Sequence, residues 1–524
     1  MQNIDWVIVG FYVLSLIIMS IAIGMRQKSQ EDYYLGGQSI RPWQVGLSMA
    51  ANQVSAISLI GAPAFIALKK GGGLSWLQYE MAIPLAMIAI LIILLPVLRH
   101  RGALTIYTWL EDRFGRATRL AVSAIFLLSR SMATGIALLA TAYVTAACTE
   151  WTLGSTILVI GGVALVYTML GGIKADIYSD IMQLFLLWGA SVAVILTLLF
   201  LMGGSLSFPA SESHRLTVFH VSSSGFGDGE TFSFWPMLLG GFFLYVSYYG
   251  CDQSQAQRLL STGTREGAVK ALVINGIIRY PLVLTYCTVG VLMVGFLESQ
   301  PGFAAALTNK SPDALMPLFF VRYLPTGILG LTVAGIFAAS MSSIDSAINS
   351  LSAATMNDFI LPFKPSLARS GDKKLVFLSR IITVLWGGFA LFFAFMMAGG
   401  SETVIELVNK TGSAFYGPVA AVFFMGILFK NPGQKSALAG LCAGFGVNLY
   451  LWLAWGGLVS WMWWNMTGFS AALFAGLAAH MMMEKEKGAG FQSPRAAAPP
   501  AVILLGAWFL VILFSALGLQ LFFK

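Results

Sequence analysis

The sequence contains little charge. Charged residues make up 10% of its 524 residues, and hydrophobic residues make up 57%. An ordinary soluble domain is about 25% charged. Such a composition excludes an ordinary soluble protein and predicts a chain that is surrounded by lipid.

Cysteine and histidine are also scarce, with four residues of each type. The cysteines stand singly in or beside apolar segments, at Cys148, Cys251, Cys287 and Cys442. Their spacing indicates neither a disulfide framework nor a metal knuckle. The sequence also has no HExxH, CxxC or GxSxG motif. These absences disfavour a membrane enzyme.

Long apolar stretches are abundant. A helix needs roughly 17 to 25 residues to cross about 30 Å of hydrocarbon, and about 14 stretches have that length. They cover residues 5–24, 45–68, 75–97, 117–147, 154–173, 177–201, 232–252, 267–296, 327–355, 374–397, 412–429, 436–453, 457–481 and 499–522. We therefore predict an all-α polytopic membrane protein with about 14 transmembrane helices.

The basic residues predict how these helices are oriented. When the stretches alternate across the membrane with Met1 outside, most of the 31 lysine and arginine residues fall in the inside loops. Cytoplasmic loops of membrane proteins normally carry such an excess. The net charge of +8 therefore needs no nucleic-acid partner. We expect a monomer in the cell membrane (inner or plasma) with both termini outside.

Two apolar stretches contain runs of polar residues, which are costly in hydrocarbon and usually face a cavity or the bundle interior. In the second stretch these residues are Ser48, Asn52, Gln53, Ser55 and Ser58. The run predicts an interrupted helix whose freed carbonyls can coordinate a cation, although simple packing against a neighbour is the alternative. The seventh stretch has a comparable run around Ser247 and Gly250.

These two stretches lie five apart and define two predicted halves. The first half with its extracellular loop covers residues 45–231, and the second covers 232–430. An odd number of helices per half inverts the second half, and paired interrupted helices in inverted halves indicate a transport site. A leading helix and loop (1–44) precede this core, and three accessory helices (431–524) follow it.

Carboxylates are expected at one depth near the cytoplasmic side. Asp180 stands about one turn into the sixth stretch, where an interfacial cap is as common as an ion ligand. The ninth stretch contains Ser342, Ser343, Asp345, Ser346, Asn349 and Ser350. Helical spacing lets oxygens from this run converge, and oxygen ligands favour a hard cation over zinc or copper. We expect Asp180 and Asp345 to meet.

Four ordered motifs make the chain resemble the sodium/solute symporter family, which includes sodium/glucose, sodium/proline and sodium/sialic acid cotransporters. They are DYYLGGQSI (32–40), GGxxAxxxxDxxQ (171–183), DQxxxQR (252–258) and SSxxS (342–346) with the following Asp358. The resemblance covers nearly the whole chain. It implies an inverted five-plus-five helix fold with flanking helices.

The resemblance also implies sodium ligands. The main site would consist of the backbone carbonyls of Ala51, Val54 and Ala339 and the hydroxyls of Ser342 and Ser343. One Na⁺ is therefore the expected cofactor.

Some family members bind a second sodium at the positions of Asp180, Asp345 and Ser346. Asp345 replaces a hydroxyl residue of the sialate carriers, so it either strengthens this second cation site or shares a proton with Asp180. Asp176 replaces an apolar residue, and we assign it no role.

Positions that resemble solute-contacting ones are Ser55, Ser58, Glu80, Tyr245, Tyr248 and Arg279. Glu80 and Arg279 have a second interpretation as a structural ion pair. Arg130 lies about one turn from the carboxylate-binding arginine of sialate carriers, so it either clamps an anion or is a structural charge. Glu80 with Tyr248 suits a sugar or polyol, and the two arginines suit a carboxylate.

We therefore expect a symporter that uses sodium to import a small polar organic solute, either a sugar or polyol or a carboxylate, by alternating access. The alternative is a transporter-like sensor that binds solute without net transport. Such sensors usually append a cytoplasmic signalling domain, and we recognise none in this sequence.

Overall fold

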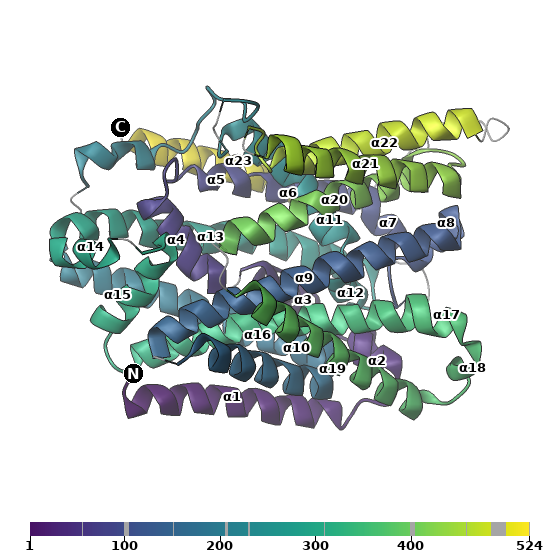
Figure 1. Ribbon diagram of the computed structural model, residues 1–524, viewed down its shortest axis with the longest axis horizontal. Coiled ribbons are helices and arrows are strands. Elements are labelled where there is room, and N and C mark those ends of the chain that lie inside the picture. Colours follow the sequence, from purple (N-terminus) through teal and green to yellow (C-terminus); the bar gives the residue numbers. More distant parts are fainter. Residues whose placement is uncertain are drawn as a thin grey trace.

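The computed structural model describes residues 1–54, 56–98, 104–149, 151–204, 208–228, 231–308, 310–398, 404–456, 458–483 and 499–522. Within these ranges the regular structure is helical, apart from isolated bridge residues such as the antiparallel pair Phe226 and Val459. Figure 1 shows most helices running side by side along the long axis of the molecule. This arrangement confirms the all-α architecture.

Ten helices of the described chain are long and apolar enough to cross a membrane. They are α1 (Asn3–Gly24), the run α5 to α7 (Trp76–Leu98), α9 (Arg116–Thr149), α10 (Leu153–Leu201), α13 (Arg265–Ser299), α16 with the turns after it (Ile328–Phe363), α19 (Asp372–Met397), α21 (Gln434–Trp455), α22 (Trp463–Met483) and α23 (Pro499–Phe522). Both chain ends lie at the same end of the bundle, on the left in Figure 1. Which side of the membrane that end faces stays a prediction.

Shorter helices, together with α10 (Leu153–Leu201), which covers two predicted stretches, account for the difference from the predicted count of about 14. The other helices of the described chain include α2 (Gln30–Leu35), α3 (Pro42–Gln53), α4 (Ala56–Leu68), α8 (Thr108–Phe114), α11 (Gly241–Cys251), α12 (Gln253–Leu260), α14 (Pro301–Leu307), α15 (Leu315–Tyr323) and α20 (Val404–Leu428). A predicted stretch that is broken into such pieces no longer contains one long helix. The count of about 14 therefore stays a prediction.

Helix α10 covers two predicted stretches. Its 49 residues would extend about 74 Å if it were straight, far more than a bilayer core. Gly172 interrupts it with φ 56° and ψ −163°. A Cβ atom there would lie 2.5 Å from the carbonyl oxygen of Tyr33, so both the conformation and the close contact require glycine.

The second and seventh stretches are each divided. Helix α3 ends at Gln53, Val54 is extended, and the directions of α3 and α4 differ by 49°. Helix α11 ends at Cys251, and extended Asp252 separates it from α12. This second break lies just beyond the expected run around Ser247 and Gly250. The inverted relation between the two halves stays a prediction.

The N-terminal end of α16 is fixed by a residue from another helix. Gly327 precedes α16 and has no side chain that could cap it. Instead, Oδ1 of buried Asp5 on α1 accepts hydrogen bonds from the backbone N–H groups of Gly327 (2.7 Å) and Gly330 (2.9 Å). These bonds satisfy donors that the first turn of a helix leaves free. Helix α1 therefore positions the helix that carries the serine-rich segment.

We expect Asp5→Ala to lower the free energy of unfolding by about 1 to 2 kcal/mol, because the N-terminal donors of α16 lose their acceptor. Asp5→Asn keeps an acceptor oxygen and should lose less. Thermal unfolding of both purified variants in detergent measures the difference. Equal midpoints for the two variants would show that this acceptor does not hold α16.

Candidate cation and solute sites

The predicted main sodium ligands lie where α16 packs against the break between α3 and α4. Ala51, Val54, Ala339 and Ser342 are buried, and Ser343 is half-buried. The side-chain amide of Asn52 donates to the backbone carbonyl of Ser342 (3.5 Å), which brings the end of α3 to α16. The last carbonyls of a helix have no partner within it. The end of α3 therefore supplies backbone oxygen beside α16.

The two serine hydroxyls of this set have different partners. Ser343 donates to the carbonyl of Ala339 (3.2 Å), so two predicted ligands are in direct contact. The hydroxyl of Ser342 donates instead to Oδ1 of Asp180 on α10. Ser342 thus connects the predicted main site with the carboxylates.

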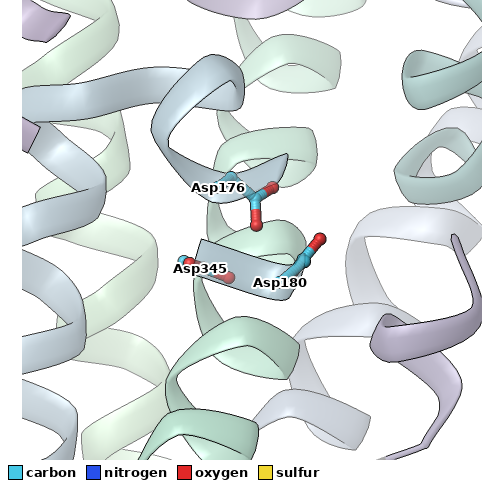
Figure 2. A group of neighbouring side chains, drawn as sticks. All are labelled: Asp176, Asp180 and Asp345. Carbon is cyan, nitrogen blue, oxygen red and sulfur yellow. The ribbon is translucent and has the colours of Figure 1, made fainter. Parts of the chain in front are cut away.

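Three buried carboxylates form one cluster. Figure 2 shows Asp176 and Asp180 on α10 and Asp345 on α16 close together. One oxygen of each lies within 4.8 Å of the others, and their exposed fractions are 2%, 0% and 0%. The structure thus brings Asp180 and Asp345 together as expected. It adds Asp176, whose spacing of four residues from Asp180 places both on one face of α10.

Arg258 on α12 forms ion pairs with two of these carboxylates. Its Nη2 lies 3.0 Å from Oδ2 of Asp176 and 3.0 Å from Oδ2 of Asp180. The same guanidinium donates to Ser48 through Nε (2.8 Å) and to Ser346 through Nη2. Its exposed fraction is 1%.

Arg258 lies between the predicted stretches 232–252 and 267–296, where the sequence predicts an inside loop, and that prediction is wrong because the structure buries Arg258 in a helix. The chain breaks at Asp252 and continues as α12, whose residues are buried although most of them are polar. Hydropathy alone predicts that such a polar segment is a loop exposed to water.

The cluster contains more negative than positive charge. Three carboxylates face one guanidinium, which leaves two formal negative charges when all are ionised. Asp345 accepts from the hydroxyl of Tyr167 and from the backbone N–H of Ser346 (2.6 Å), which are neutral donors. Buried charge is strongly unfavourable unless it is paired. The geometry therefore favours uptake of a cation or a proton at this cluster.

Glu80 and Arg279 form the ion pair that was the second interpretation of these residues. Nε and Nη2 of Arg279 lie 3.1 Å and 3.3 Å from the two carboxylate oxygens of Glu80. Both side chains are buried. Tyr245 packs against Tyr79, which directly precedes Glu80, and the two ring centroids are 4.8 Å apart. The pairing neutralises both charges.

Arg130 belongs to a separate polar network. Asn52 accepts hydrogen bonds from Tyr248 (2.9 Å), Gln255 (3.0 Å) and Nη2 of Arg130 (3.4 Å). The guanidinium carbon of Arg130 lies 5.7 Å from the ring centroid of Tyr248. Its buried Nε has no hydrogen-bond partner, and it forms no salt bridge with the described residues.

The remaining predicted solute residues lie in or beside the interrupted helix. Ser58 is half-buried on α4. Ser55 lies outside the described residues.

Sequence comparisons identify related proteins. A profile of the sodium:solute symporter family matches residues 33–444. Sodium-coupled monocarboxylate transporter 1 of Xenopus laevis is 27% identical over 459 residues, which cover 85% of this chain and 71% of the relative. The human sodium/iodide cotransporter is 28% identical over 467 residues, which cover 85% of this chain and 69% of the relative.

Comparison of structures gives the same fold. The substrate-bound outward-open structure of a Na⁺-coupled sialic acid symporter superimposes with a TM-score of 0.81, covering 95% of this chain and 100% of the other at 22% identity. The relatives are transporters and not enzymes, and the family implies Na⁺ as the coupling ion. Together with its membrane-spanning helices, these matches show that this multi-pass membrane protein belongs to the sodium:solute symporter family.

Proposed function

We propose that this protein is a sodium-coupled symporter that imports a small organic carboxylate by alternating access. The observation that carries the proposal is the packing of the serine-rich segment of α16 against the break between α3 and α4. An interrupted helix at this position offers carbonyl oxygens to a cation. The alternative, a sensor without net transport, predicts solute binding without uptake.

The proposed main sodium site combines the carbonyls of Ala51, Val54 and Ala339 with the hydroxyls of Ser342 and Ser343. The carbonyls and hydroxyls are hard ligands without full charge, which suits a monovalent cation that must be released into the cytoplasm. A sodium ion here would connect the end of α3 with α16. It would order the interrupted helix beside Asn52, which belongs to the network around Arg130. Solute affinity should therefore depend on sodium.

The two arginines that could bind a carboxylate differ in their surroundings. Each arginine has one buried nitrogen without a hydrogen-bond partner, Nη1 in Arg279 and Nε in Arg130. Glu80 forms an ion pair with Arg279, whereas Arg130 forms no ion pair among the described residues and is attracted only electrostatically by Asp252. A guanidinium with free donors binds a carboxylate well, in bidentate geometry. Relatives are named for monocarboxylate, iodide and sialic acid, all of which carry negative charge at neutral pH. These observations support a carboxylate rather than a sugar or polyol.

We also propose a second cation site at Asp180, Asp345 and Ser346, with Asp176 as a further ligand. Arg258 compensates one of the three carboxylates, and a sodium ion would compensate one of the two remaining formal negative charges. Each additional sodium that enters contributes about 2.3 kcal/mol per 100 mV of membrane potential. A second ion would therefore raise the limit of solute accumulation.

Proteoliposomes test the solute class. An inward sodium gradient should drive uptake of short carboxylates such as lactate, and equimolar potassium or a neutral sugar should give none. We expect Arg130→Gln to raise the KM for the carboxylate about 30-fold, because a charged hydrogen bond is worth about 2 kcal/mol. The exposed Arg322 provides a control, since Arg322→Gln should leave the KM unchanged.

Sodium-driven uptake of sugar but not of carboxylate, with an unchanged KM in Arg130→Gln, would contradict the carboxylate assignment. Binding without gradient-driven uptake or counterflow would favour the sensor.

Ser343→Ala tests the main sodium site. Loss of one hydroxyl ligand should raise the sodium concentration for half-maximal uptake about tenfold, which corresponds to about 1.4 kcal/mol. Sodium-dependent thermal stabilisation provides a readout that needs no solute. Ser350→Ala is the matched control, because Ser350 is on the same helix and donates to a backbone carbonyl as Ser343 does. The same half-saturation in Ser343→Ala as in the control would argue against the site.

Asp345→Ser tests the second cation site by restoring a hydroxyl. We expect the number of sodium ions carried per solute to fall from two to one, with sodium half-saturation at the main site changed less than in Ser343→Ala. The measurement is the ratio of sodium flux to solute flux, determined in parallel at several sodium gradients. An unchanged ratio in Asp345→Ser would exclude Asp345 as a ligand of a transported cation.

A further inference from the structure

A groove opens between three helices that are not neighbours in sequence. Its volume is about 510 Å³, and it is lined by the first turn of α3, the first turns of α13 and the first turns of α23. Its apolar walls include Val273 and Ile274 from α13, Leu504 from α23 and Trp43 from α3. Leu504 and Trp43 are 49% and 44% exposed, so the groove is open to its surroundings.

One basic residue lines this groove, and a second one directly precedes a lining residue in the sequence. The exposed Lys270 is the one charged residue among those that line it, and it lies one turn before Ile274 on α13. The exposed Arg41 directly precedes Pro42, which lines the groove at the start of α3. The acidic residue closest to Lys270 along α13 is Glu266, one turn earlier and outside the lining.

The groove lies at a predicted cytoplasmic interface. Helices α3, α13 and α23 all begin here, at Pro42, Arg265 and Pro499. Helix N-termini carry partial positive charge and favour anions. Tryptophan is enriched at the membrane interface, and Trp43 occupies such a position.

We infer that this groove binds an anionic phospholipid, with its acyl chain along α13 and α23 and its phosphate beside Lys270. The apolar walls match the chain, and the basic mouth matches the headgroup. Anionic lipids in the cytoplasmic leaflet attract nearby basic residues electrostatically. Basic pockets between membrane helices bind the headgroups of these lipids. A zwitterionic lipid would gain the acyl contact without the net charge attraction.

The position of the lipid gives it a structural effect. Helix α3 belongs to the predicted first half, α13 to the predicted second half and α23 to the accessory helices. A lipid in the groove contacts all three, and it therefore stabilises the arrangement seen here. This inference does not depend on the transported solute, because the lining residues are separate from the proposed sodium and solute residues.

Native mass spectrometry of the delipidated full chain tests the inference, with dioleoyl phosphatidylglycerol and dioleoyl phosphatidylcholine titrated in parallel. The first bound phosphatidylglycerol should have higher affinity than phosphatidylcholine. Lys270→Gln should weaken phosphatidylglycerol binding about fivefold, and Lys270→Arg should retain it. Lys374→Gln is the matched control, since Lys374 is exposed at the start of α19 on the same predicted side.

A second variant tests the apolar part. Leu504→Trp places a larger side chain in the groove and should weaken binding of phosphatidylglycerol while Lys270 is intact. Soluble glycerol 3-phosphate should not compete, because it lacks the acyl chain. Equal affinity for both lipids, equal effects of Lys270→Gln and Lys374→Gln, or full competition by glycerol 3-phosphate would each overturn the inference.

Discussion

The ion pairs of Arg258 constrain the rest of the structure. Its guanidinium lies 3.0 Å from Asp176 and Asp180 on α10, and it also contacts Ser48 on α3 and Ser346 on α16. Removing one partner from a buried ion pair costs about 3 to 5 kcal/mol, because an uncompensated charge stays behind. Any movement that separates α12 from α10 must therefore bring water or another cation to the carboxylates. Cation binding at the proposed second site would therefore be coupled to helix movement.

The hydroxyl of Ser342 extends this coupling toward the break between α3 and α4. It donates to Asp180, while the carbonyl of the same residue accepts from Asn52. Because the hydroxyl of Ser342 donates its hydrogen to Asp180, the lone pairs of its oxygen stay available. A sodium ion can therefore bind this oxygen without competing with Asp180. One serine can therefore serve an ion on one side and a carboxylate on the other. The two proposed cation sites would then be energetically linked.

Local signals in the sequence predicted much of the architecture. Apolar stretches located the long helices, polar runs located the two divided stretches, and the depths of Asp180 and Asp345 predicted their meeting. Contacts between distant residues were harder to predict. The pairing of Glu80 with Arg279 remained one of two alternatives, because a single sequence does not show which of two buried charges meet. Arg258 was misassigned because α12 is buried without being apolar.

The distribution of paired charge also bears on the solute. A buried guanidinium that is paired with a carboxylate stabilises the fold, because its charge is compensated directly. Arg279 meets that description through Nε and Nη2, which donate to Glu80, while its Nη1 has no partner. Arg130 does not, because its contacts are the neutral Asn52 and the face of Tyr248. Asp252 attracts this guanidinium electrostatically without forming an ion pair, so the positive charge of Arg130 is compensated less directly than that of Arg279. An anionic solute bound to Arg130, as proposed, would add direct compensation at this guanidinium.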